Sequence, residues 1–238
     1  MKELTEEDFL AGQLLLIDKP LTWSSFQAVN ALKWAIRKKF NLKKIKIGHA
    51  GTLDPLASGL LLVCAGKFTK KISELQGQIK EYTGTINVGA TTPSYDLETE
   101  VNETFPIAHI TEEAIENATG AFLGEISQYP PVFSALKKDG KRLYEYAREG
   151  VAVTIQPRNI TIEAFEITRI ALPEIDFRVV CSKGTYIRSL AHDFGKELGS
   201  GAHLSALRRT KIGEYNVDNA ITPKEFQFEL GVISTIES

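Results

Sequence analysis

The clearest apolar segment of the chain is residues 60–65, where six apolar residues follow one another (LLLVCA). This run has the length and composition of a buried strand. The twelve residues before it (GHAGTLDPLASG) hold glycines at three positions and a proline directly after Asp54. Glycine permits unusual backbone conformations, and proline restricts the residue that precedes it. The pattern therefore predicts a rigid loop, anchored to a sheet, that displays one carboxylate.

Two periodicities mark the other elements. After Ser24 or Ser25, which can cap a helix, apolar residues recur at spacings of three and four from Val29 to Phe40. Further helices are predicted over 67–75, from 111, and over 142–149, 185–198 and 223–230, and strands over 13–17, 80–89, 151–155, 160–170, 175–181 and 212–217. The β-branched, alternating strands between 151 and 181 favour an antiparallel meander. We expect an α+β fold with a central mixed, mainly antiparallel sheet flanked by helices and loops.

Length and composition narrow the class of protein. The 238 residues are 43% hydrophobic and 24% charged, as in ordinary soluble globular proteins. An acidic N-terminus argues against a targeting peptide, and no apolar run approaches membrane-spanning length. Cys64 and Cys181 lie in apolar segments far apart in sequence, which favours reduced core thiols. We expect a cytoplasmic monomer that does not bind a membrane, with one domain over residues 1–217 and a short tail over 218–238.

Charge is strongly segregated although the net charge is only −2. Residues 33–46 hold seven basic side chains and no acid, whereas residues 83–124 hold seven acids and no lysine or arginine. Residues 178–211 again hold seven basic side chains against two acids. Such a distribution predicts a basic face, which is what holding phosphates requires. Any single cluster, taken alone, is equally well explained as a solvated helix face.

A basic hairpin is predicted within residues 130–150. Two prolines break the chain at its start, and Asp139-Gly140 marks a tight turn. The turn is surrounded by Lys137, Lys138, Lys141 and Arg142, and two tyrosines follow at 144 and 146. Aromatic rings interleaved with positive charge suit a segment that clamps a nucleic acid.

Several familiar sites are absent from the sequence. The loop at 48–52 lacks the Gly-Lys-Ser/Thr ending of a phosphate-binding loop, and no Gly-x-Gly-x-x-Gly or Gly-x-Ser-x-Gly motif occurs. The four histidines show no zinc-ligand spacing with the two cysteines, and His192 and His203 read as surface or capping residues. We therefore expect no metal and no nucleotide cofactor.

What remains is a set of groups suited to chemistry on an RNA base or sugar. Asp54 supplies a carboxylate, Tyr82 a ring on a strand, and Arg188 a positive charge in the first turn of a helix. Because a positive charge is unfavourable at the start of a helix, we expect Arg188 to pair with a carboxylate or a phosphate. Asp-Pro also commonly starts a turn, so the loop alone leaves a capping role for Asp54 open.

The motifs together resemble the TruB family of tRNA pseudouridine-55 synthases. The resemblance rests on residues 48–59 and extends in the same order from about residue 12 to 215: Asp18-Lys19-Pro20 with Ser24-Ser25, Lys80-Glu81-Tyr82, Ser134-Ala135-Leu136-Lys137 with Gly140-Lys141 and Tyr144, Lys183 to Arg188, and Gly201-Ala202-His203-Leu204 with Leu207-Arg208-Arg209. It implies the pseudouridine synthase fold and isomerisation of a uridine in the T-loop of tRNA. The glycosidic bond breaks, the uracil turns, and C5 bonds to C1′. Since the same atoms are present before and after, no cofactor is implied.

The resemblance also implies roles for single residues. Asp54 matches the catalytic aspartate, Arg188 the arginine that pairs with it, and Tyr82 the tyrosine that stacks on the extruded base. His49 matches the histidine that enters the T-loop as the target flips out. The substrate-binding set is completed by Tyr186, Leu207, Lys19, Lys70, Lys137, Arg208 and Arg209, where the basic residues are assigned to phosphates or to the pocket wall.

Two departures from the family pattern matter. Position 50 is alanine where threonine is usual. The roughly twenty residues after Val217 are too few for the PUA domain of most bacterial members, so we expect the basic face to supply most of the tRNA affinity. Two other readings stay open: an RNA-binding or tRNA-folding module, and the catalytic subunit of an RNA-guided pseudouridylation particle.

Overall fold

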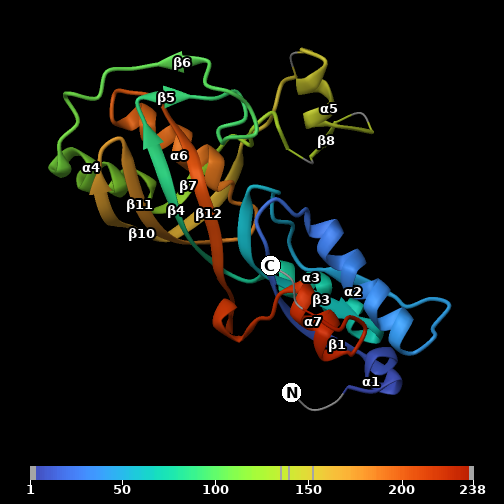
Figure 1. Ribbon diagram of the computed structural model, residues 1–238. Coiled ribbons are helices and arrows are strands. Elements are labelled where there is room, and N and C mark those ends of the chain that lie inside the picture. The colour runs from blue at the N-terminus through green and yellow to red at the C-terminus, as the bar shows by residue number, and fades with distance from the viewer. Residues whose placement is uncertain (1–3, 135, 139, 152, 236–238) are drawn as a thin grey trace. The chain divides into compact units, whose positions relative to one another are not determined.

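The computed structural model describes residues 4–134, 136–138, 140–151 and 153–235 (Figure 1). The chain divides into two compact units, the first of residues 1–81 with 208–238 and the second of residues 82–207. Nine of the described strands belong to a mixed, mainly antiparallel sheet, and strands β4 (Lys80–Val88) and β12 (Ala202–Ile212) each have residues in both units. The α+β class and the sheet type predicted from the sequence are confirmed.

The first unit is built around strand β3 (Ala57–Ala65). Strand β1 (Gln13–Lys19) pairs with it antiparallel, from Gln13 opposite Ala65 to Lys19 opposite Gly59. Strand β2 (Ile47–His49) also pairs with β3, and β13 (Tyr215–Asn216) pairs with β12. The other elements of the unit are α1 (Glu6–Ala11), α2 (Ser25–Lys39), η1 (Gly66–Lys71), α3 (Ile72–Gly77), η3 (Val217–Asn219) and α7 (Pro223–Glu229).

Helices cover both faces of β3, which explains why its sequence is continuously apolar. Leu61 and Val63 pack in one cluster with residues of α2 and α7, including Leu32 and Phe226. Leu60, Leu62 and Cys64 pack on the other side with Leu75 of α3. A strand buried on both faces has no polar positions, so the alternation typical of a half-exposed strand is absent.

The second unit holds the rest of the sheet in the order β12-β4-β11-β10-β7. Strand β10 (Arg158–Ala171) pairs antiparallel with β11 (Glu174–Cys181) on one side and β7 (Gly124–Gln128) on the other. Phe122, Phe165, Phe177 and Phe194 form a ring cluster, with centroids 5.3 to 6.1 Å apart, that packs α6 (Ile187–Glu197) on the sheet. The remaining elements are β5 (Ala90–Thr91), β6 (Glu103–Thr104), α4 (Glu112–Ala118), η2 (Thr119–Phe122), β8 (Lys137–Lys138), β9 (Lys141–Arg142) and α5 (Leu143–Arg148).

Most predicted elements are present. Ser24 caps α2, Thr111 caps α4, and β10 and β11 pair antiparallel as two of the three strands of the predicted meander. The basic hairpin is also present, because β8 and β9 pair antiparallel with Lys137 opposite Arg142; the turn residue Asp139 lies outside the described residues.

Two predicted strands are wrong. Residues 151 and 153–155 form no strand, and position 152 lies outside the described residues. The segment is β-branched but mostly exposed, and Pro157 follows it, so composition alone does not supply a pairing partner. The predicted strand at 212–217 is instead the end of β12, a turn at Gly213 (φ +54°) and the short β13.

Strand β12 was missed because it carries buried polar side chains. His203, predicted to be a surface or capping residue, is 4% exposed, and its Nδ1 lies 2.9 Å from the carbonyl oxygen of Ala90. Arg209 is 1% exposed. Polar groups can be buried when they find hydrogen-bond partners, and those partners are distant in sequence.

Both cysteines are buried thiols that form no disulfide, as predicted, and burial raises the pKa of the Cys64 thiol to about 11. Within the described ranges, no helix combines the length and apolar character needed to cross a membrane.

Gly59 is a position where only glycine fits. Its φ is +103°, and an added Cβ would lie 2.3 Å from the carbonyl oxygen of Arg209. We expect Gly59→Ala to lower the free energy of unfolding by at least about 2 kcal/mol, since left-handed strain and a backbone clash add. Urea denaturation measures the change.

Gly77→Ala is the matched control in the same unit. A Cβ at Gly77 would meet nothing within 4 Å. Its unfolding free energy should stay the same or rise slightly. Equal stability of the two variants would contradict the account of Gly59.

Candidate active site

The loop that carries Asp54 is fixed on both sides of the carboxylate. The Ser25 hydroxyl accepts a hydrogen bond from Leu53 N at 2.8 Å and donates to Leu53 O at 3.1 Å. After Asp54, the carbonyl of Pro55 accepts from Thr22 N at 2.8 Å. Asp54 itself is half-buried. The loop is therefore rigid, as predicted, and the start of α2 holds it.

Two buried cations lie beneath this loop. Arg209 donates from Nε to Leu60 O at 2.8 Å and from Nη2 to Gly51 O at 3.0 Å. Lys19 is fully buried and donates from Nζ to the carbonyls of Pro20 and Trp23. Burial lowers the pKa of Lys19 to about 8, while the nearby Asp54 carboxylate opposes that shift. Asp54 thus faces a positive field from within its own unit.

Burial corrects part of the predicted role of Lys19 and Arg209. At 0% and 1% exposure, neither side chain is open to an RNA phosphate. Both instead hold backbone carbonyls around the Asp54 loop. The predicted position of Lys19 and Arg209 in the wall of the substrate pocket stays a prediction.

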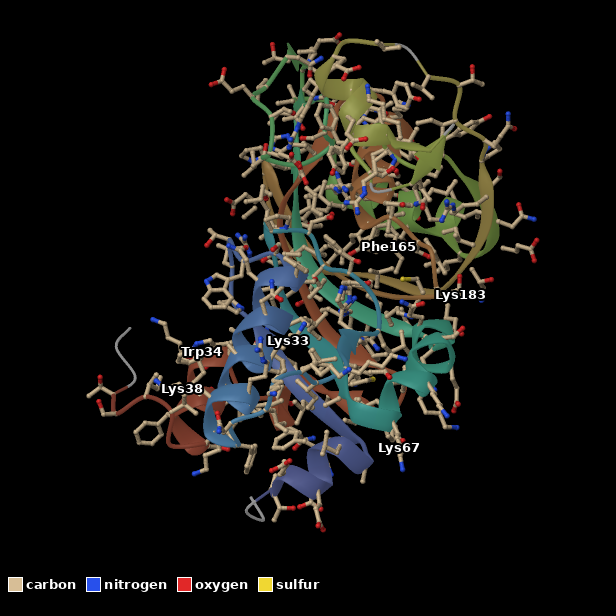
Figure 2. The ribbon with its side chains drawn as sticks, turned by 90° about the vertical axis from the view of Figure 1, so that its right-hand side faces the viewer. Lys33, Trp34, Lys38, Lys67, Phe165 and Lys183 are labelled. Atoms are coloured by element: carbon tan, nitrogen blue, oxygen red, sulfur yellow. The ribbon has the colours of Figure 1, made fainter. Side chains whose placement is uncertain are left out.

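The other predicted residues of the first unit differ in exposure. Arg208 forms two hydrogen bonds to the Asp18 carboxylate, at 3.0 and 2.7 Å, with its side chain 40% exposed. Lys70 is exposed and lies on η1, three residues after Lys67, and Figure 2 labels Lys67. His49 lies at the end of β2, and burial together with Arg209 lowers its pKa, which favours the neutral ring. Its Nδ1 is buried without a hydrogen-bond partner among the described residues.

In the second unit, Arg188 lies in the first turn of α6 and is 5% exposed. Its Nε lies 3.6 Å from Oδ2 of Asp96, and its Nη1 donates to Ser94 O at 3.2 Å. Arg188, for which a carboxylate or phosphate partner was expected, thus forms an ion pair with the Asp96 carboxylate. Its pairing with Asp54 stays a prediction.

No role was predicted for Asp96 from the sequence. The loop around Asp96 is held by its own hydroxyls, because Thr92 donates to Asp96 O at 2.6 Å and Ser94 donates to the same oxygen at 3.1 Å. The Asp96 carboxylate accepts from Glu98 N at 3.0 Å. The run TTPSYD, dense in residues that bond to backbone, is the signal that marks an ordered loop.

Tyr95 ties the same loop to α6. Its ring stacks on that of His192, with centroids 3.8 Å apart and planes at 11°. Its carbonyl accepts from Leu204 N at 2.9 Å, so the loop is also bound to β12. His192 is half-buried in this stack, so it is neither a free surface residue nor a cap.

The remaining predicted residues of the second unit lie on different elements. Tyr82 lies on β4 and is 8% exposed. Tyr186 is the N-cap residue of α6, and its backbone N–H and C=O both form hydrogen bonds to the side chain of Gln128. The Arg158 guanidinium lies 5.5 Å from the centroid of the Tyr186 ring. Leu207 is half-buried on β12. Lys137 lies on β8, but its side chain falls outside the described part of the chain.

The structure therefore brings the predicted residues together in two sets. Asp54, Lys19 and Arg209 interact in the first unit, which also holds His49, Lys70 and Arg208. The second unit holds Arg188, Tyr82, Tyr186, Leu207 and Lys137. Across the described residues, no three His, Cys, Asp or Glu side chains are grouped to hold a metal ion.

Comparison with solved structures defines the class of protein. A crystal structure of a Cbf5-Nop10-Gar1 complex matches with a TM-score of 0.67 and 30% identity, over 92% of this chain and 54% of that one. A structure of an H/ACA RNP bound to a substrate RNA containing 2'-deoxyuridine matches with a TM-score of 0.64 and 29% identity, over 93% and 54%. This chain spans about half the length of each. Its fold is that of the pseudouridine synthases.

Sequence comparison is more specific. Residues 37–187 match the family described as TruB family pseudouridylate synthase (N terminal domain), and residues 188–232 match the tRNA pseudouridylate synthase B C-terminal domain. Proteins named tRNA pseudouridine synthase B match from Flavobacterium johnsoniae, 68% identical over 95% of this chain and 100% of the relative, and from Parabacteroides distasonis, 53% identical over 92% and 93%. The chain belongs to the TruB family and is an isomerase, a pseudouridine synthase.

The ion pair of Arg188 gives a testable prediction. Asp96→Asn should lower the turnover of uridine to pseudouridine by about tenfold or more, because a buried arginine that loses one charged partner is held less firmly in its position. We expect a lower kcat with little change in KM. Steady-state kinetics on a defined RNA measures both.

Glu98→Gln is the control, since Glu98 lies two residues away and its ion pair with Arg148 is exposed. Exposed pairs contribute little. This variant should keep wild-type turnover. Equal kcat values for Asp96→Asn and wild type would contradict a role for Asp96 in holding Arg188.

His192 should make stability depend on pH. Burial, with the Lys196 ammonium nearby, lowers its pKa from 6.5 to about 4, against a hydrogen bond with the Ala202 backbone. Between these values the unfolded chain binds a proton that the folded chain does not, so the free energy of unfolding falls as pH drops from 6.5 to 4. At pH 7 both states are neutral and the contribution vanishes.

His192→Phe keeps a ring against Tyr95 but cannot bind a proton. We expect the variant to lose less stability than wild type between pH 6.5 and 4.5, as measured by thermal denaturation. Asp193, whose pKa burial raises, is present in both proteins, so its contribution cancels. Parallel pH profiles would refute the assignment.

Proposed function

We propose that this pseudouridine synthase isomerises a uridine in the T-loop of tRNA, position 55, with Asp54 as its catalytic aspartate. The observation that carries the proposal is the Asp54 loop, which Ser25 and Arg209 hold by four hydrogen bonds to Leu53, Leu60 and Gly51. A carboxylate held in place needs no reorganisation when it meets its substrate. The names of the relatives, tRNA pseudouridine synthase B, support tRNA as that substrate.

In the proposed reaction, the bond from C1′ to N1 of the uridine breaks. The uracil rotates, C5 bonds to C1′, and the proton on C5 leaves while N1 takes up a proton. Asp54 attacks or stabilises the sugar or the base during this exchange. The Lys19 ammonium interacts electrostatically with the Asp54 carboxylate from within the same unit.

The second unit supplies most of the other proposed roles, and His49 of the first unit supplies one more. Arg188, held by Asp96 and Ser94, is the counter-charge of Asp54, and Tyr82 stacks on the extruded base. Tyr186 and Leu207 line the pocket. His49, with its neutral ring, enters the T-loop as the uridine leaves the stack, which offsets part of a flipping cost of a few kcal/mol.

The RNA-guided alternative draws on the fold shared with the Cbf5-Nop10-Gar1 complex. That likeness is at 30% identity over about half of the other chain, whereas the bacterial relatives are up to 68% identical over almost the whole of this one. The comparison favours an enzyme that acts on free tRNA. A cytoplasmic location and a monomeric state belong to the same proposal.

The test uses an unmodified tRNA transcript carrying C5-tritiated uridine. Wild type should release tritium without a guide RNA or cofactor, and Asp54→Asn should reduce release by at least about 1,000-fold while tRNA affinity stays within about threefold. The affinity should persist because a single carboxylate contributes little to phosphate contacts.

Asp218→Asn is the control, because Asp218 is an exposed acid of the same unit. It should release tritium at the wild-type rate. Release by Asp54→Asn at that rate would overturn the role of Asp54. No release by wild type from bare tRNA would overturn the proposed substrate and favour the guided alternative.

A further inference from the structure

Two large apolar side chains are exposed beside the Asp54 loop. Leu21 is 56% exposed and Phe26 is 70% exposed. Each is next in sequence to a residue that binds the loop, since Thr22 N donates to Pro55 O and Ser25 bonds to Leu53. Leu21 and Phe26, which we call the apolar rim, therefore expose apolar surface one residue away from the contacts that hold the Asp54 loop.

Helix α2 begins at this rim, and all of its charged side chains are positive. The helix contains Lys33, Arg37, Lys38 and Lys39 and no acid. Trp34 is 46% exposed, and the Lys38 ammonium lies 4.7 Å from its ring centroid. Figure 2 shows Trp34 and Lys38 projecting outward from the helix. From Phe26 to Lys38 the helix rises by about 18 Å.

The side chains on this face are better suited to bind a nucleic acid than a protein. Exposed aromatic rings alternate with positive charges, which is how proteins hold single-stranded nucleic acid: bases stack on the rings and lysines contact the phosphates. A protein partner would meet four cations without a compensating acid on the helix. The first ring of the face also lies beside the proposed catalytic loop.

Resting on the proposed function, we propose that the RNA strand adjoining the target uridine lies along the outer face of α2, with an unstacked base on Phe26 and the backbone along Trp34 and Lys38. Binding to this face compensates for bases that leave the stack when the uridine is extruded. It also supplies affinity from within the first unit.

The first test compares Phe26→Ala with Phe26→Trp. Loss of one stacked base should weaken tRNA binding by about tenfold or more, and a tryptophan should restore it. At saturating tRNA, kcat should change less than KM. Phe228→Ala is the control, because Phe228 is an exposed ring (46%) on α7 of the same unit. It should bind like wild type.

The second test uses Trp34 as a probe. The chain has two tryptophans, so Trp23→Phe leaves Trp34 as the only one. Addition of unmodified tRNA should quench its fluorescence, and excess salt should reverse the quenching because the phosphate contacts are electrostatic. Lys38→Ala in the same background should weaken the binding that the fluorescence reports.

The outcomes separate this proposal from the proposed function. If wild type releases tritium but Phe26→Ala binds tRNA normally and Trp34 fluorescence does not change, the α2 face is not the RNA site. Should wild type lack activity on tRNA yet bind it through Phe26 and Trp34, the proposed substrate chemistry fails and the binding face stands. Binding of a protein by this face without any effect on tRNA would also overturn the proposal.

Discussion

The first unit depends on the burial of one guanidinium. Arg209 has almost no contact with solvent, and a cation in that position is stable only if carbonyl oxygens replace water. It obtains them from Leu60 on β3 and from Gly51 in the Asp54 loop. The same two bonds that satisfy the charge join β12 to β3 and to the loop that precedes β3. Gly59 lacks a side chain because the Arg209 backbone passes where a Cβ would lie.

This arrangement explains what could be read from the sequence and what could not. The apolar run at 60–65, the cap of α2 and the antiparallel pair of strands within 160–181 are local patterns, and the structure has all three. Strand β12 contains a buried histidine and a buried arginine, whose partners Ala90, Leu60 and Gly51 lie more than 100 residues away. Periodicity cannot reveal such partners, because nothing local distinguishes a buried cation from a solvated one.

The candidate active site also divides into features that local sequence patterns predict and features that depend on partners distant in the sequence. Asp54 could be selected from its glycine-rich loop and from the family motif, and the rigidity of the loop was readable from its composition. The buried state of Lys19 was not, since a lysine between an aspartate and a proline reads as a turn residue. Asp96 was missed for a related reason: its importance comes from Arg188, which is 92 positions further along the chain. A carboxylate is recognised as functional only when its partner is known.

The two aspartates are held by the same physical means. In the first unit Thr22, with φ of +69°, directs its N–H to the loop of Asp54, and in the second Tyr95, with φ of +64°, directly precedes Asp96. Left-handed backbone is costly for residues with a Cβ, and most of all for a β-branched threonine. Such strain persists only where surrounding contacts enforce it, and it gathers at functional sites. The Thr22 bond to Pro55 and the Tyr95 stack on His192 are those contacts, so both loops are stabilised in one conformation before any substrate binds.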